Sequence, residues 1–92
     1  MKIVKKKEVA QSLEELFDEA IGFQKEKLLN LARRIIPHLT QDDILQPCDF
    51  PELENNPIFR YEEGVCEGLL TAKTLHLRFK RELDLKEGEE VL

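Results

Sequence analysis

Hydrophobic residues recur at helical spacing in two long segments of this chain. The clearer segment begins at Asn56-Pro57, where asparagine can cap a helix and proline fits its first position. Apolar residues then recur every three or four positions until about Leu83. The pattern predicts a helix over 57–83, about 39 Å long at the α-helical rise per residue.

This helix is apolar on more than one side. One stripe is predicted to face a companion helix: Ile58, Tyr61, Val65, Leu69, Ala72, Phe79 and Leu83, with His76 on the same line. A second group lies about a third of a turn away: Phe59, Cys66, Leu70 and Leu77. Small residues, Gly64 and Gly68, follow one ridge with Ala72. Because one neighbouring helix covers only one stripe, the second group needs the connector, the N-terminal segment or another copy of the chain to cover it. We predict that this group and the two glycines form an interaction surface.

The other long segment is predicted to be a helix over 13–36. Ser12-Leu13-Glu14-Glu15 has the spacing of a capping box, although the helix could start anywhere from Lys6. Pro37 ends it. Its apolar residues fall on one broad face: Leu13, Leu16, Phe17, Ala20, Ile21, Phe23, Leu28, Leu31, Ala32 and Ile35.

Between the long helices the sequence predicts a connector with one short helix. Thr40 is a typical N-cap and Pro47 a stop, so residues 40–46 are expected to form one or two turns. Phe50 and Leu53 are expected to fold back onto the end of the bundle. Residues 1–11 and 84–92 are expected to be loosely ordered tails, with a pairing of 2–4 and 90–92 as short strands as the alternative.

These elements predict an all-α, single-domain fold: a helical hairpin with a short helix in its connector. An antiparallel pair is the commoner topology, while the connector is also long enough for a parallel pair. A domain of 92 residues buries only a modest core. We therefore expect a homodimer, in which two hairpins complete a four-helix bundle.

The composition of the chain narrows the range of binding partners to expect. The net charge of −5 disfavours a nucleic-acid binder, although the basic residues Lys5, Lys6 and Lys7 keep a nucleic-acid accessory role open. No signal peptide or apolar run of membrane-spanning length is found, and the two cysteines, Cys48 and Cys66, do not make a disulfide framework. The expected location is the cytoplasm, and no membrane partner is expected.

Four polar residues lie between the two apolar stripes: Glu62, Lys73, His76 and Lys80. Such a group could bind an anion or handle protons; alternatively, the lysines extend to solvent while Glu62 and His76 pair at a wet interface. The chain has no Glu-x-x-His pair, no phosphate-binding loop and no primed nucleophile, so we predict no catalytic residue, metal or cofactor.

The sequence thus predicts a small, non-enzymatic interaction or regulatory protein that acts through apolar helix faces. The alternative is a helical bundle that binds a small ligand or metal through Glu62, Lys73 and His76.

Overall fold

The structure, a computed structural model, describes residues 6–90, and these residues contain helices and no strand. The elements are α1 (Lys6–Ile35), α2 (Gln41–Ile44), the 3₁₀ turn η1 (Pro47–Asp49), α3 (Pro51–Glu54) and α4 (Pro57–Glu90). The predicted all-α class and the two long helices are confirmed. None of the helices within residues 6–90 is long and apolar enough to cross a membrane.

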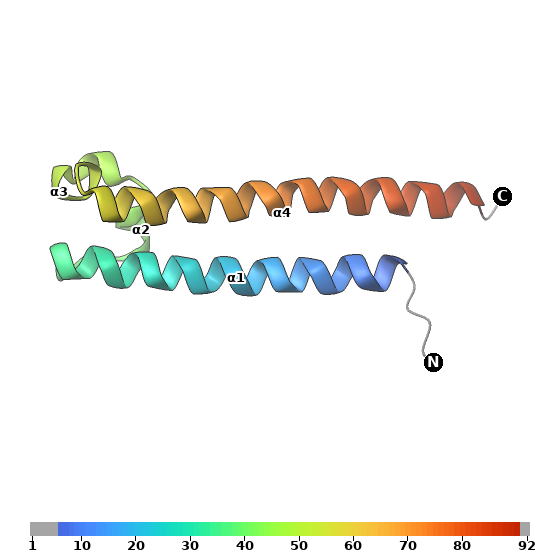
Figure 1. Ribbon diagram of the computed structural model, residues 1–92, viewed down its shortest axis with the longest axis horizontal. Coiled ribbons are helices and arrows are strands. Elements are labelled where there is room, and N and C mark those ends of the chain that lie inside the picture. Colours follow the sequence, from blue (N-terminus) through green and yellow to red (C-terminus); the bar gives the residue numbers. More distant parts are fainter. Residues whose placement is uncertain (1–5, 91–92) are drawn as a thin grey trace.

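The two long helices lie side by side and run in opposite directions, and the connector gathers at one end of the pair (Figure 1). The chain is accordingly elongated, with extents of 57 × 27 × 19 Å. We call the connector end the loop end and the opposite end the free end.

Two predicted helix starts are confirmed by their hydrogen bonds. Asn56 Oδ1 accepts from the backbone N–H groups of Ile58 at 3.0 Å and Phe59 at 2.9 Å. Thr40 and Asp43 form a reciprocal capping box: the Asp43 N–H donates to Thr40 Oγ1 at 3.3 Å, and the Thr40 N–H donates to Asp43 Oδ2 at 2.9 Å. Each cap satisfies backbone donors that a helix start leaves without partners.

Both long helices extend further than predicted. Helix α1 starts at Lys6, so Ser12 lies inside it and does not cap it, and α4 continues to Glu90. Residues 6–11 and 84–90 are therefore helical, which corrects the expectation of loosely ordered tails. Packing explains the early start, because Ala10 is only 1% exposed. The strand pairing of 2–4 with 90–92 falls almost entirely outside the described residues.

The connector folds back onto the loop end, as predicted for Phe50 and Leu53. Leu53 is completely buried and Phe50 packs against the same cluster. The core cluster at this end contains Leu28, Leu29, Ala32, Leu39, Ile44, Leu53 and Phe59. The sequence did not predict η1 and α3; each begins with a proline at its first position, where the missing N–H leaves no hydrogen bond unmade.

Candidate interaction surface

The two long helices meet along one row of residues from each, which we call the seam. In both helices the row alternates spacings of three and four, and every member is buried or half-buried. Helix α1 contributes Ala10, Glu14, Phe17, Ile21, Gln24, Leu28, Leu31 and Ile35. Helix α4 contributes Phe59, Glu62, Cys66, Leu69, Lys73, His76, Lys80 and Leu83. This repeat is the packing pattern of coiled coils and helical bundles.

Toward the free end the seam is closed largely by polar contacts. His76 Nε2 donates to the backbone carbonyl of Ala10 at 2.6 Å, and its ring lies 5.7 Å from that of Phe17. One turn on, Lys80 Nζ donates to Glu14 Oε2 at 2.7 Å. One turn before His76, Lys73 forms an ion pair with Asp18. These contacts fix which residues of α1 and α4 lie opposite each other.

Glu62 is the polar member of the seam nearest the loop end. Its carboxylate accepts from Gln24 Nε2 at 2.7 Å and pairs with Lys27 Nζ at 3.1 Å. The Gln24 hydrogen bond first, and then the Lys27 ammonium, hold the pKa of the Glu62 carboxyl below its ordinary value. The charged form is thus the one that the folded chain stabilises.

The structure does not gather the four predicted polar residues into one site. All four lie in the seam, but Glu62 and His76 are about four helical turns apart, roughly 21 Å at the helical rise. Each contacts its own partner on α1. Within the described residues, no three side chains of histidine, cysteine, aspartate or glutamate come together as metal ligands could.

A second row of apolar residues runs beside the seam on each helix, and all its members except the half-buried Ala72 are exposed. Each of its members comes one residue before a seam position, so it repeats with the same spacings of three and four. We call the two rows together the open face: Val9, Leu13, Leu16, Ala20 and Phe23 of α1, with Ile58, Tyr61, Val65, Gly68, Ala72, Leu75 and Phe79 of α4. Phe23 is 76% exposed, Tyr61 70% and Leu75 61%.

Both rows lie on the same side of the pair. A shift of one residue turns a side chain by about 100° around its helix, and in two antiparallel helices this shift points both rows the same way. The geometry agrees, because Phe23 of α1 and Ile58 of α4 line one open hollow of about 590 Å³, together with Lys27 and Arg34.

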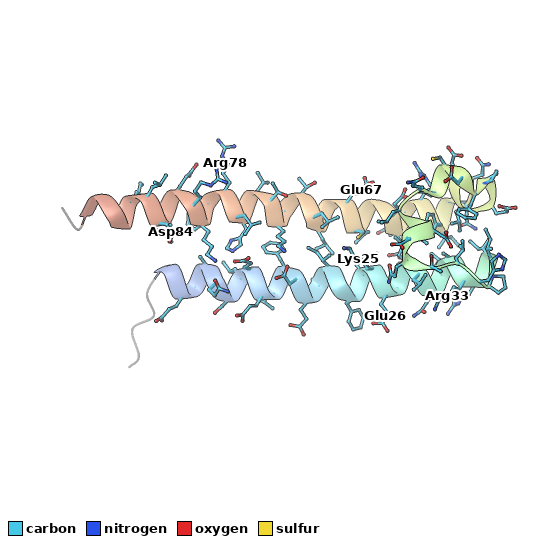
Figure 2. All side chains as sticks on the ribbon, turned by 180° about the vertical axis from the view of Figure 1, so that it is seen from behind. Lys25, Glu26, Arg33, Glu67, Arg78 and Asp84 are labelled. Atoms are coloured by element: carbon cyan, nitrogen blue, oxygen red, sulfur yellow. The ribbon has the colours of Figure 1, made fainter. Side chains whose placement is uncertain are left out.

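The opposite side of the pair carries the connector. Helix α2 lies behind the long helices in Figure 1 and in front of them in Figure 2, the view from behind. Lys25 and Glu67, labelled in Figure 2, line a hollow on this side together with Asp42 and Leu45 of the connector. The connector therefore covers one side of the pair, and no segment among residues 6–90 covers the open face.

The predicted interaction surface is corrected in part. Phe59 is 0% exposed and Cys66 6%, because both lie in the seam. Leu70 and Leu77 lie toward the connector side, 41% and 39% exposed. Gly64 faces outward and Gly68 belongs to the open face.

The stripe that was predicted to face the companion helix divides between two surfaces. Leu69, His76 and Leu83 lie in the seam, as predicted, while its other members belong to the open face. Ile58, Tyr61 and Phe79 are 62%, 70% and 55% exposed. The sequence contains part of the signal, since each helix carries two rows of identical spacing offset by one residue, but this spacing does not say which row faces inward.

The remaining sequence hypotheses fall on residues that the structure does not describe in detail. Residues 1–5 are not described, and for Lys6 and Lys7 only the helical backbone is described. The hypothesis that Lys5, Lys6 and Lys7 bind nucleic acid therefore stays a prediction.

Comparisons with known proteins add no family or function. No protein-family model matches the chain, and no curated protein or solved structure is significantly similar to it. The side chains and surfaces of the chain itself therefore carry the functional argument.

Proposed function

We propose that this protein is a non-enzymatic interaction module that associates with itself through the open face, so that two helical hairpins form a four-helix bundle. The observation that carries this proposal is the row of exposed apolar residues that runs beside the seam on both long helices.

Helix geometry supports a bundle. A helix at the corner of a four-helix bundle touches two neighbours, in directions about a right angle apart, and therefore needs two apolar rows. In both α1 and α4 the seam and the open-face row are one residue apart, which is about 100° around the helix. The seam serves the neighbour within the chain, and the open-face row suits a neighbour from a second hairpin.

The area of the open face supports a stable interface. From their exposed fractions, its six larger aliphatic and three aromatic side chains leave roughly 700 Å² of apolar surface in solvent. The largest apolar patch on a typical monomer is about 300–600 Å². A standard interface buries about 800 Å² on each partner. The open face is thus larger than a monomer usually exposes and is close to the area that a dimer buries.

The test is to replace one leucine of the open face by glutamate. The control is the same substitution at a leucine outside this face. Leu75→Glu places a carboxylate in the proposed interface of both copies, where burial without a partner is costly. We expect the dimer dissociation constant to rise about a hundredfold or more, measured by sedimentation velocity.

Leu85→Glu is the matched control, because Leu85 is also on α4, is 64% exposed against 61% for Leu75, and points away from α1. It should leave the dissociation constant nearly unchanged. A chain that stays monomeric at high concentration, or equal effects of both substitutions, would overturn the proposal.

A further inference from the structure

We infer that the hollow on the connector side of one chain binds the basic segment, residues 1–7, of another copy. This contact goes beyond the proposed association through the open face, because the hollow lies on the opposite side of the pair. The apolar floor of the hollow, the carboxylates around it and the composition of the basic segment support this contact.

The hollow has an apolar floor and presents two exposed leucines. It lies between α1, α2 and α4 and has a volume of about 330 Å³. Leu28, Ile44 and Cys66 form its floor and are at most 6% exposed. Leu45 and Leu70 also line it and are 73% and 41% exposed. The volume is at the lower end of the range for binding sites and leaves room for aliphatic side chains of a partner.

Carboxylates dominate the rim of the hollow. Asp42, Glu63 and Glu67 line it, against one cation, Lys25. Glu63 pairs with Arg60 at 2.8 Å, whereas Asp42 and Glu67 form no ion pair with another described residue. The rim therefore favours a partner that brings cations to these two carboxylates.

The charge of the connector has its complement in the basic segment. Residues 39–59 contain five acids and no lysine or arginine, whereas residues 1–7 contain four lysines and no acid. Ile3 and Val4 lie between these lysines, so the segment carries aliphatic side chains with cations on both sides. It matches the hollow in both respects, because interfaces commonly place apolar contacts at the centre and complementary charges at the rim.

The basic segment is too short to reach the hollow of its own chain. Helix α1 begins at Lys6, and Leu28 lies about 33 Å further along it at the helical rise. Residues 1–5 span about 17 Å even when fully extended. The segment that fills the hollow therefore comes from another copy. Because the two contacting surfaces differ, such contacts can continue from copy to copy.

The experiment uses the full chain and a fluorescent synthetic peptide of residues 1–7, with binding followed by fluorescence anisotropy. We expect saturable binding that weakens as salt is raised, because salt screens exposed charges. A second peptide keeps every lysine and carries Ile3→Ser and Val4→Ser. Its dissociation constant should be about tenfold higher, because it lacks the aliphatic side chains that the hollow would bury.

Variants of the full chain locate the contact. Asp42→Asn with Glu67→Gln removes two carboxylates of the rim and should raise the dissociation constant of the peptide about tenfold. Lys25→Glu replaces the cation of the rim and should lower it severalfold, a gain that misfolding would not produce. Glu15→Gln with Glu19→Gln is the matched control, because both acids are exposed on α1 outside the hollow, and it should leave binding unchanged.

Three results would overturn this contact. The first is no saturable binding of the peptide. The second is equal binding of both peptides, which would mean that the lysines alone bind, without side chains in the hollow. The third is an equal effect of the rim variant and its control. The open-face association is measured separately, by sedimentation of Leu75→Glu, so the failure of either proposal is distinguishable from failure of the other.

Discussion

The loop half and the free-end half of the molecule hold their helices together by different means. At the loop end, leucines, alanine, isoleucine and phenylalanine from both long helices and the connector make one buried cluster. At the free end, the seam depends on Lys73, His76 and Lys80 and on their polar partners. Many of the apolar side chains of that half lie outside the seam, on the open face.

This difference indicates how the two halves contribute to the free energy of unfolding. Burial of apolar surface is the dominant stabilising contribution in folding, while exposed or half-exposed ion pairs add little. The loop half therefore has a core of its own, and the free-end half would gain most by burying its open face against a second copy.

Phe59→Ala is expected to destabilise the hydrophobic core of the loop half. Phe59 is 0% exposed within the core cluster, and truncating such a phenylalanine costs about 3–5 kcal/mol of unfolding free energy. That is a large share of the stability of a small domain. Chemical denaturation followed by circular dichroism measures the loss.

Phe79→Ala is the matched substitution in the free-end half. Phe79 is 55% exposed, so the unfolding free energy of the dilute chain should change little. We expect the dimer to weaken about tenfold or more. A large stability loss at low concentration for Phe79→Ala would contradict the contrast between the two halves.

Gly68 and Gly64 test whether the open face is covered, because Gly68 belongs to that face and Gly64 faces outward. Both are exposed on α4, and neither has an atom within 4 Å of an added Cβ, so each should accept leucine in the monomer. Leucine should also stabilise the helix by up to about 1 kcal/mol, because it has a higher helix propensity than glycine.

In the proposed dimer only Gly68 is covered. Gly68→Leu should therefore weaken the dimer by about tenfold, while Gly64→Leu should leave it unchanged. Sedimentation of both variants at matched concentrations measures this. A dimer that tolerates Gly68→Leu as well as Gly64→Leu would place the interface elsewhere.

Glu62 gives the smallest expected effect, a dependence of stability on pH. Because its pKa is lower in the folded chain than its ordinary value, its contribution to stability is present above the ordinary carboxyl pKa. The contribution is lost as pH falls through the lower, folded-state value. Glu62→Gln should reduce the loss of stability on acidification, measured by denaturation at several pH values.

Gln24→Ala removes the hydrogen bond that contributes most to this lowering, so it should reduce the same pH dependence. A pH profile identical to that of the unmodified chain in both variants would mean that these contacts do not favour the charged carboxylate.

The features that the sequence predicted correctly rest on local chemistry. The N-caps at Asn56 and Thr40 each depend on a few neighbouring residues. The capping signal at Ser12 favoured a start of α1 near Leu13 and left an earlier start, from Lys6 onward, open; the structure has the earliest of these starts. The contact of Ala10 with His76, 66 residues later in the chain, outweighs that signal.

The assignment of the two apolar rows of α4 could not be made from that helix alone. Ile58 and Phe59 are adjacent and equally apolar, and which of them faces inward depends on where Leu53 and Leu39 pack. Polar seam partners such as Gln24 for Glu62 were also missed, because their pairing depends on the relative height of two helices that are distant in sequence. Long-range packing decides both features.

Residue-resolved amide hydrogen exchange of the unmodified chain, at low and high protein concentration, shows whether the open face is buried by self-association. If a second copy covers the open face, protection of backbone amides in residues 13–20 and 72–79 should rise with concentration. Protection in residues 28–32, which lie in the loop-half core, should change much less. Exchange in the free-end half that is independent of concentration would contradict self-association through the open face.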